Sequence, residues 1–412
     1  MKNIIKISLR NLLRFKRRTF LTASLISFGV IFVIIFESIS GSFKAMIIGQ
    51  ITDSMLGHIQ IHKKGYVAST ENSPLNLNLK EKAFNRSIQV LNSINEIEYY
   101  SPRVKFSGML SNYIESTGIR LNGIYPEKEF KTVPLLQQRI VSGSKSLNKG
   151  EILIPDLLFR GLKLKLNDTL VIIATNKDGS VNGKQFKLVG VLESITGPGG
   201  RDGYIHIEDA SDLLKIEQLE VSELALRLRN FSKLKKVSKE IDLLLAKELN
   251  KEEKAIYEVH SWDKLSPFAH IAGMIDLMSI FIKVMLIAIV LISVMNIMIM
   301  AVYERIREIG TIAAIGTLPK KILSMFLIEG LFLGLIGAIS GSTLSIVIIF
   351  IINLIKIHFS FGKQENLLLI AKVYPVNIVF ASVIVVLVAT IASFWPAYKA
   401  SKMEPIKALK HL

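Results

Sequence analysis

Four long stretches without a charged residue constrain this chain more than any other feature of its sequence. They cover 20–36, 284–302, 330–355 and 373–398. A helix needs about 20 residues to cross about 30 Å of hydrocarbon, and each stretch is near or above that length. Half of all residues are hydrophobic, and they are concentrated in these stretches. The sequence therefore predicts a membrane protein with four transmembrane helices.

The positive charge predicts how the chain is oriented. The formal net charge is +17, and residues 2–18 hold basic side chains without an acidic one. More lysines follow the last apolar stretch. Because cytoplasmic segments are rich in Lys and Arg, both termini and residues 303–321 are predicted to be cytoplasmic. A cleavable signal peptide at 20–36 is the alternative, but this stretch is longer than the usual apolar core of about 7–15 residues.

The segment between the first two spans is predicted to be a large α+β domain outside the cytoplasm. Short alternating stretches such as "GHIQIHKK", "EILIPD", "DTLVIIAT" and "GYIHIED" indicate strands separated by turns. Residues 81–92 and the "LKKVSKEIDLLL" stretch have helical spacing. The chain has no cysteine, which excludes disulfides and thiolate metal sites.

The expected organisation places a stalk on each side of this domain. Residues 262–283 are amphipathic and run into the second span, and the first span is extended in the same way, so both helices are expected to continue beyond the membrane. The predicted segments are a basic N-terminus (1–19), helix 1 with stalk (20–48), the external domain (49–261), stalk with helix 2 (262–302), a cytoplasmic helix (303–321), helix 3 (322–355), an external loop (356–374), helix 4 (375–396) and a cytoplasmic tail (397–412).

Catalytic chemistry is not evident in the sequence. The nearest approach to a phosphate-binding loop, "GSVNGKQ" at 179–185, has the wrong spacing and is better interpreted as a hairpin turn. His58 and His62 could share one side of a strand, but no third ligand lies nearby in sequence, so we expect surface histidines and no metal. We expect no enzyme activity and no cofactor in this chain, with ATP and Mg²⁺ used by a partner.

Residues 303–318, "YERIREIGTIAAIGTL", predict a short amphipathic helix between the second and third spans. Ile306, Ile309 and Ala313 share one face, and Gly316 and Pro319 provide a stop. Arg305 is spaced to reach Glu308. A solvated connector and a helix that docks into a groove of a partner are both compatible with this pattern.

The third span contains glycines at a spacing of four residues, at 330, 334, 337 and 341. Such spacing allows two helices to approach closely, although glycine is also tolerated in membranes or at kinks. Glu329 stands at the start of this span, where a carboxylate is costly unless paired. We expect a structural pair with a nearby Lys or Arg or a place at the interface.

Three stretches, "SLRNLLRFKRR", "YERIREIGTIAAIGTLPKKI" and "FWPAYKASKMEPIKAL", together resemble the FtsX/MacB-type permeases of ABC transporters. The external stretches "SPRVKFSGML", "LNGIYPEKEF" and "FKLVGVLES" resemble the lipoprotein-releasing LolC and LolE branch. The chain lacks the fused ATPase domain of a MacB protein, and its external domain is larger than that of cell-division FtsX proteins. Glu329 stands where the lipoprotein-releasing branch more often has an uncharged polar residue, which leans toward the efflux branch.

The resemblance implies a MacB-like periplasmic domain between helices 1 and 2, a second permease (homodimer or heterodimer) and a separate LolD-like ATPase. It implies an inner-membrane protein that works by mechanotransmission, in which ATP-driven closure is passed along the stalks to the external domain. The residues matching the ATPase-coupling stretch are Glu304, Arg305, Arg307, Glu308, Ile309, Gly310, Ala314 and Gly316.

In the lipoprotein-releasing branch, acyl chains of a lipoprotein substrate are held near the first spans and passed to a periplasmic carrier. The resemblance implies a lipid cavity lined by Phe28, Phe32, Phe36, Ile39 and Phe43, although these side chains could equally face bulk lipid. It also implies a carrier-contact loop at 194–204, with Pro198, Gly199, Arg201, Asp202 and Tyr204. An efflux permease for macrolides or peptides, or a regulator of a cell-wall hydrolase, are the alternatives. No nucleic acid is expected as a partner.

Overall fold

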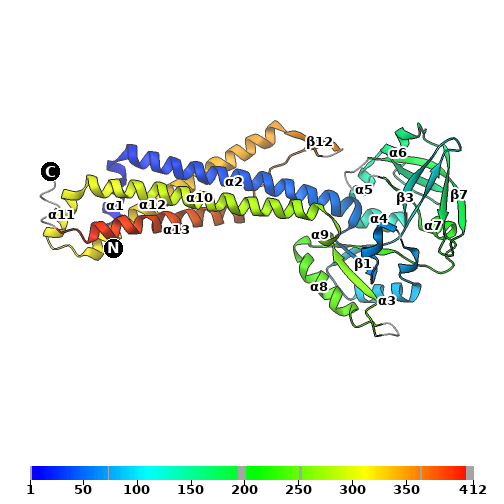
Figure 1. Ribbon diagram of the computed structural model, residues 1–412. Coiled ribbons are helices and arrows are strands. Elements are labelled where there is room, and N and C mark those ends of the chain that lie inside the picture. Colours follow the sequence, from blue (N-terminus) through cyan, green and yellow to red (C-terminus); the bar gives the residue numbers. More distant parts are fainter. Residues whose placement is uncertain (1, 73, 194–200, 250–252, 362–363, 405–412) are drawn as a thin grey trace. The chain divides into compact units, whose positions relative to one another are not determined.

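The computed structural model describes residues 2–72, 74–193, 201–249, 253–361 and 364–404 (Figure 1). The chain divides into two compact units. The helical unit comprises Met1–Lys44, Gly273–His358 and Leu368–Leu412, and the β-rich unit comprises Ala45–Ala272 and Phe359–Leu367.

Four long helices dominate the helical unit and run side by side (Figure 1). They are α2 (Lys16–Ile51), α10 (Phe268–Glu304), α12 (Pro319–Ile355) and α13 (Pro375–Ser401). In the described part of the chain, these 4 helices are long and apolar enough to cross a membrane, which confirms the predicted number of spans. At about 1.5 Å per residue, α2 is about 54 Å long. It therefore extends well beyond the hydrocarbon thickness, as a stalk requires.

Two short helices lie at one end of this unit, α1 (Lys2–Arg14) and α11 (Ile306–Ala314) (Figure 1). The Ser8 hydroxyl of α1 donates a hydrogen bond of 2.9 Å to the Met325 carbonyl of α12. A hairpin of β11 (His358–Phe361) and β12 (Gln364–Leu368) follows α12. After this hairpin, the backbone of Lys372 is hydrogen-bonded to the hydroxyls of Ser38 (2.7 Å) and Ser42 (2.8 Å), so the chain is held against α2.

The glycines of α12 allow two neighbouring helices to approach it. A Cβ at Gly334 would lie 2.9 Å from the Ala389 Cβ of α13, and one at Gly337 would lie 2.5 Å from the Ile26 Cγ2 of α2. Both distances are shorter than ordinary van der Waals contact, so no side chain fits there without displacement. The predicted packing role of the glycine spacing is confirmed, with α12 between α13 and α2.

The β-rich unit is built on a 10-stranded sheet in the order β10-β1-β9-β2-β3-β8-β5-β7-β4, with β6 pairing β2 and β7. Most neighbouring strands are antiparallel, whereas β3/β8 and β5/β7 are parallel. The strands are β1 (Ile59–Lys63), β2 (Ile97–Ser111), β3 (Ser116–Ile124), β4 (Ile140–Gly143), β5 (Glu151–Pro155), β6 (Thr169–Thr175), β7 (Val181–Leu192), β8 (Asp202–His206), β9 (Glu223–Leu228) and β10 (Tyr257–Ser261).

Helices cover this sheet, and alternating apolar side chains of the strands form its core, with Val104, Ile154 and Leu188 fully buried. The helices are α3 (Glu81–Asn92), α4 (Pro126–Thr132), α5 (Leu135–Gln138), α6 (Asp156–Gly161), α7 (Ile207–Leu213), α8 (Leu234–Leu245) and α9 (Trp262–Leu265). Shorter helical turns are η1 (Thr52–Leu56), η2 (Val67–Asn72), η3 (Leu75–Leu77) and η5 (Phe231–Lys233). The predicted α+β domain between the first two spans is confirmed.

The expected continuous helix from residue 262 into the second span is wrong in one respect. After α9 the backbone of Ser266 is extended, with φ −115° and ψ 129°, and α10 begins only at Phe268. Pro267 explains the break, because a proline disfavours the helical conformation in the residue before it. From Phe268 onward the helix is uninterrupted to Glu304.

Candidate functional site

The segment between α10 and α12 folds as the short helix α11. Its start is set at Arg305, whose φ of −111° and ψ of 18° interrupt the helical path after Glu304. Its end is set at Gly316, which has φ +91° and donates from its backbone N–H to the Ala313 carbonyl at 3.0 Å. This left-handed conformation favours glycine. Pro319 then occupies the first turn of α12, so the predicted stop signals act as expected.

The two faces of α11 differ from the expected docking arrangement. Ile306 and Ile309 are 9% and 2% exposed and pack inside the chain's own helical unit. Gly310 is also buried. Ile306 and Ile309 of the predicted stripe are therefore not available to a partner's groove, and Gly310, one of the residues matched to the ATPase-coupling stretch, is likewise covered by the chain itself. The exposed face instead carries Arg307, Ile312 (36% exposed), Ala314, Ile315 (79%) and Gly316, and Leu318 (61%) follows it.

Arg305 forms the buried centre of this end of the helical unit. Its Nη1 lies 2.9 Å from Glu329 Oε1 of α12, and the two side chains are 3% and 1% exposed. Asn11 Nδ2 of α1 donates to the same carboxylate oxygen at 2.8 Å. The guanidinium also stands 4.5 Å from the ring centroid of Phe15. The expected pairing of Arg305 with Glu308 is therefore wrong, whereas the expected pairing of Glu329 with a basic residue is confirmed. Because Arg305 is buried, it cannot itself contact a partner protein.

The helices α1 and α2 contact the segment between α10 and α12 from a second side. Arg14 Nη1 lies 3.3 Å from Glu308 Oε1, and Arg18 Nη1 of α2 lies 3.1 Å from Glu304 Oε2. In the sequence these arginines indicated the orientation and formed part of the family resemblance, but this pairing was not predicted. The available clue was a polar stripe on α1, since the buried Ser8 and the hydrogen-bonded Asn11 lie three residues apart on one face.

Two ion pairs join α2 and α10 farther along the bundle. Lys44 Nζ lies 2.5 Å from Asp276 Oδ1, and Lys283 Nζ is paired with Glu37 Oε1. In each helix the paired positions are seven residues apart, which is about two helical turns. The pairs fix the register of the two stalk helices, which run in opposite directions.

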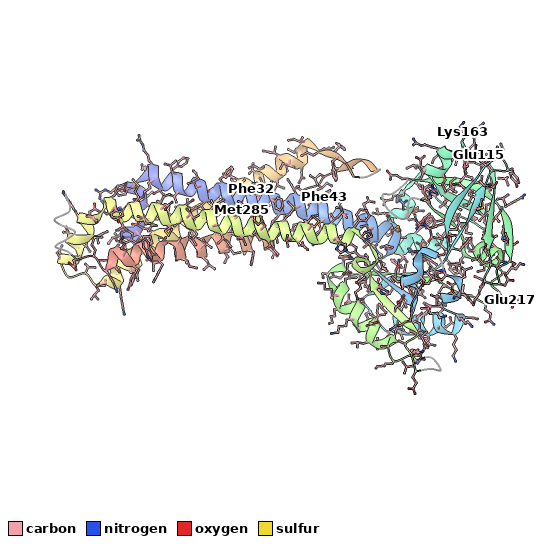
Figure 2. All side chains as sticks on the ribbon, viewed as in Figure 1. Phe32, Phe43, Glu115, Lys163, Glu217 and Met285 are labelled. Carbon is pink, nitrogen blue, oxygen red and sulfur yellow. The ribbon has the colours of Figure 1, made fainter. Side chains whose placement is uncertain are left out.

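The residues predicted to line a lipid cavity share one face of α2, but their environments differ. Phe28 and Phe32 are 70% and 55% exposed. Phe36, Ile39 and Phe43 are partly buried, and this is the part of α2 that holds the backbone of Lys372. Figure 2 shows Phe32 and Phe43 along α2 and Met285 on α10. A separate apolar groove of about 500 Å³ lies between α12 and α13 and is lined by residues such as Leu335, Ile339 and Val383.

The predicted carrier-contact loop at 194–204 lies only partly within the described residues. Pro198 and Gly199 lie outside the described residues, and Arg201 is exposed. Asp202 and Tyr204 belong to β8, so their placement in a protruding loop is wrong. Asp202 is paired with Arg120 (Oδ1 to Nε, 2.8 Å), and Tyr204 is 4% exposed. Parallel pairing of β8 with β3 draws these residues into the sheet.

Two further sequence interpretations are settled by the β-rich unit. "GSVNGKQ" lies at the β6/β7 hairpin, where Thr175 pairs with Val181, so the turn interpretation is confirmed. His58 and His62 are 5% and 2% exposed, so the expectation of surface histidines is wrong. His58 Nδ1 accepts a hydrogen bond of 3.0 Å from the Leu228 N–H.

Comparison with known proteins agrees with this architecture. The model of the FtsX-like permease C-terminal family matches residues 280–405, and that of the MacB-like periplasmic core domain matches residues 19–244. LolC, the lipoprotein-releasing system transmembrane protein of Neisseria meningitidis, is 24% identical over 94% of this chain and 92% of its own length.

Two other relatives match over shorter regions. An uncharacterised ABC transporter permease of Methanocaldococcus jannaschii is 25% identical over 56% of this chain, and the match spans only 56% of that protein. The macrolide export protein MacB of Mannheimia succiniciproducens is 37% identical over 29% of this chain and 17% of its own length. The chain belongs to the FtsX-like ABC transporter permeases that carry a MacB-like periplasmic core domain.

Proposed function

We propose that this chain is a permease subunit that releases lipoproteins from the outer leaflet of the cytoplasmic membrane to a carrier. The energy comes from ATP hydrolysed by a separate, LolD-like subunit with Mg²⁺. The observation that carries the proposal is the construction of α11, which is held to α12 by the buried Arg305–Glu329 pair and presents a second, exposed face. The match to LolC over nearly the full length of both chains supports lipoproteins as the substrate.

The exposed face of α11 is the proposed docking surface for the ATPase. Arg307 provides a positive charge, and Ile312 and Ile315 provide exposed apolar surface. Isolated apolar residues of this kind fit a hydrophobic groove on a partner. Glu304 and Glu308 line the edge of the surface, where they pair with Arg18 and Arg14. These contacts couple a movement of α11 to α1, to α2 and to the part of α12 that contains Glu329.

The stalk helices are the proposed route of transmission. The helix α10 is uninterrupted from Phe268 to Glu304, so a tilt at one end is not absorbed by a break. The pairs Lys44–Asp276 and Glu37–Lys283 oblige α2 to move with α10. In this mechanism the lipoprotein does not cross the membrane, and its acyl chains are displaced from a cavity beside the first span.

A second permease, identical or different, completes the proposed lipid cavity. Phe28 and Phe32 provide exposed aromatic surface on α2 that such a cavity requires. The carrier would be met at the segment that precedes β8, of which Arg201 is described and exposed. The excess of basic residues at both ends of the sequence supports cytoplasmic termini and a β-rich unit outside the cytoplasm.

Efflux of macrolides or peptides through an adaptor and an outer-membrane tunnel is the second candidate. The observation that favours it is the 37% identity to MacB over a 118-residue region, which is higher than the identity to LolC over the whole chain. This match covers only 29% of this chain and 17% of MacB, so it supports a substrate class less than the match to LolC over nearly the full length of both chains does.

A depletion strain tests the proposal. Cells depleted of this chain should retain lipoproteins in the cytoplasmic membrane, as measured by membrane fractionation and immunoblotting. Wild type should rescue, and Ile315→Glu should fail because it places a charge on the docking face. Val181→Glu is the matched control, since Val181 is 67% exposed on β7, outside the helical unit. Normal localisation of every lipoprotein together with increased drug sensitivity would decide for efflux.

A further inference from the structure

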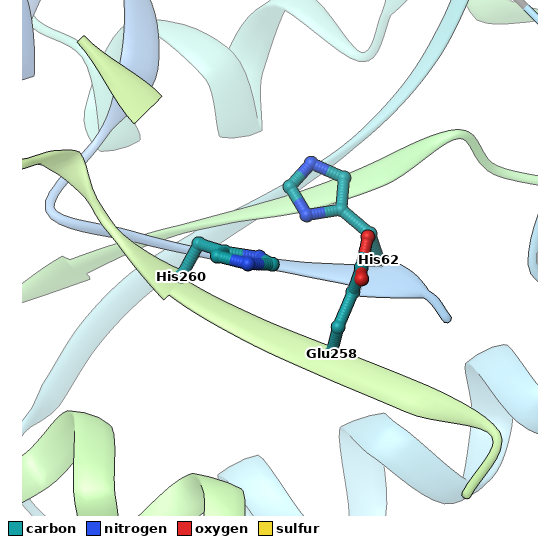
Figure 3. A group of neighbouring side chains, drawn as sticks. All are labelled: His62, Glu258 and His260. Carbon is teal, nitrogen blue, oxygen red and sulfur yellow. The ribbon is translucent and has the colours of Figure 1, made fainter. Parts of the chain in front are cut away.

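Three side chains from two distant segments of the sequence meet on one face of the strand pair β1/β10. The strands are antiparallel, with His62 opposite Glu258 and Gln60 opposite His260. Because side chains alternate along a strand, Glu258 and His260 point to the same face, and His62 lies directly across from Glu258. One possible ligand atom from each of His62, Glu258 and His260 lies within 4.8 Å of the other two (Figure 3).

The two histidines of this group have unused ring nitrogens. His62 is 2% exposed, and its Nδ1 has no hydrogen-bond partner among the described residues. The Nδ1 of His260 is likewise buried and without a partner in the described part of the chain. A buried polar atom normally has a partner, because leaving it unsatisfied costs about 1–3 kcal/mol.

The surrounding residues orient this group as the outer shell of a metal site does. His62 Nε2 lies 3.6 Å from Glu223 Oε2, and Glu223 is itself held by Arg103 Nη1 and Lys105 Nζ, each at 2.7 Å. A carboxylate facing Nε2 favours the proton on that nitrogen and leaves the Nδ1 lone pair available. The backbone N–H groups of Gly65 (3.1 Å) and Val67 (2.8 Å) donate to the Glu258 carboxylate and fix its direction.

We propose that His62, Glu258 and His260 form a binding site for a divalent transition metal of the zinc type. Two imidazoles and one carboxylate are a common three-ligand set for Zn²⁺, with water at the fourth position. Ligands at about 2.0 Å in a tetrahedral array stand about 3.3 Å apart. The present separations are up to 4.8 Å, so binding would require the side chains to move closer by about 1.5 Å at most.

The position of the site in the chain gives it a mechanical role. The strand β1 follows α2 after the short turn η1, and β10 continues through α9 into α10. A metal ion bound by His62, Glu258 and His260 cross-links the strand by which the chain enters the sheet to the strand by which it leaves. The ion therefore stiffens the part of the β-rich unit that is continuous in sequence with both stalk helices.

Metal binding by the full-length chain tests this proposal without reference to transport. The protein is purified in detergent with a tag that contains no histidine, treated with EDTA, and titrated with Zn²⁺ by calorimetry, with the metal content measured by mass spectrometry. Wild type should bind one equivalent, and Co²⁺ in place of Zn²⁺ should give the visible absorption of a tetrahedral site. Glu258→Gln and His260→Gln should each weaken binding at least tenfold.

His270→Ala is the matched control and should bind as wild type does, because His270 is exposed in α10 and outside the group. His62 is too buried for a safe substitution, so the test relies on the two partly buried ligands, with circular dichroism verifying that each variant is folded. Absence of zinc binding in wild type would overturn the proposal. Unchanged affinity in folded Glu258→Gln and His260→Gln variants would do the same.

Discussion

Replacing Glu329 by Gln should destabilise the helical unit far more than its single lost charge suggests. Arg305 and Glu329 are 3% and 1% exposed and are joined at 2.9 Å. Removing one partner of a buried ion pair typically destabilises a protein by about 3–5 kcal/mol, because the other charge stays buried without compensation.

The structure places this substitution at the lower end of that range. The Gln amide oxygen can still accept from Arg305 and Asn11, which now donate to Glu329 Oε1. The Phe15 ring, 4.5 Å from the guanidinium, continues to stabilise the cation by about 1 kcal/mol. We therefore expect a loss of about 3 kcal/mol, which is more than a 100-fold change in the ratio of folded to unfolded protein.

Unfolding in mixed micelles with increasing SDS, followed by circular dichroism, measures this loss. The matched control is Glu308→Gln, whose pair with Arg14 is exposed and should contribute at most about 1 kcal/mol. The double variant Arg305→Met with Glu329→Leu removes both charges and should be close to wild type in stability. Equal losses of unfolding free energy in Glu329→Gln and Glu308→Gln would refute the reasoning. A double variant that is less stable than Glu329→Gln would refute it as well.

Three further predictions follow from the same contacts. Gly337→Leu should destabilise the bundle by about 1–3 kcal/mol in the same SDS assay, because the new side chain would collide with Ile26 of α2. Gly273→Leu is the control and should leave the stability unchanged, because nothing lies within 4 Å of its Cβ position. Lys44→Glu should lower lipoprotein release while ATP hydrolysis by the complex continues, and adding Asp276→Lys should restore release by re-forming the pair. A double variant as defective as Lys44→Glu would argue against a role of the Lys44–Asp276 pair in transmission. Burial alone would raise the pKa of Glu223, but Lys105, His62 and Arg103 outweigh it and hold that pKa well below its ordinary 4.5. The stability that ionised Glu223 contributes is therefore present above about pH 4.5 and is lost as the pH falls further. The melting temperature should accordingly decrease less steeply from pH 6 to pH 3 in Glu223→Gln than in wild type.

Much of the fold follows from local patterns in the sequence. Lengths and spacings of apolar residues predict the four spans, and alternation predicts strands such as β1, β5 and β6. The strand β2 is harder to predict because Pro102, Ser107 and Gly108 interrupt its alternation, although it pairs with three other strands. Its stability comes from these neighbours and not from its own sequence.

The sites depend on partners that no local pattern specifies. The spacing of Arg305 and Glu308 suits a helical pair, yet Arg305 turns inward to Glu329 because the helix is interrupted at that residue. His62 lacks a nearby third ligand in sequence, whereas the sheet places Glu258 directly opposite it. Such contacts depend on strand order and helix packing, which periodicity alone does not encode.

Cross-linking from the exposed face of α11 tests the central claim most directly. The chain contains no cysteine, so Ile315→Cys introduces a single reactive thiol on the proposed docking surface. Leu344→Cys, in the middle of α12 and 49% exposed, is the control outside that surface. In native membranes treated with a short thiol-to-amine cross-linker, we expect Ile315→Cys to capture a subunit that binds ATP and Leu344→Cys to capture none. Capture of no ATP-binding subunit by Ile315→Cys, in cells where the chain supports lipoprotein release, would contradict the account.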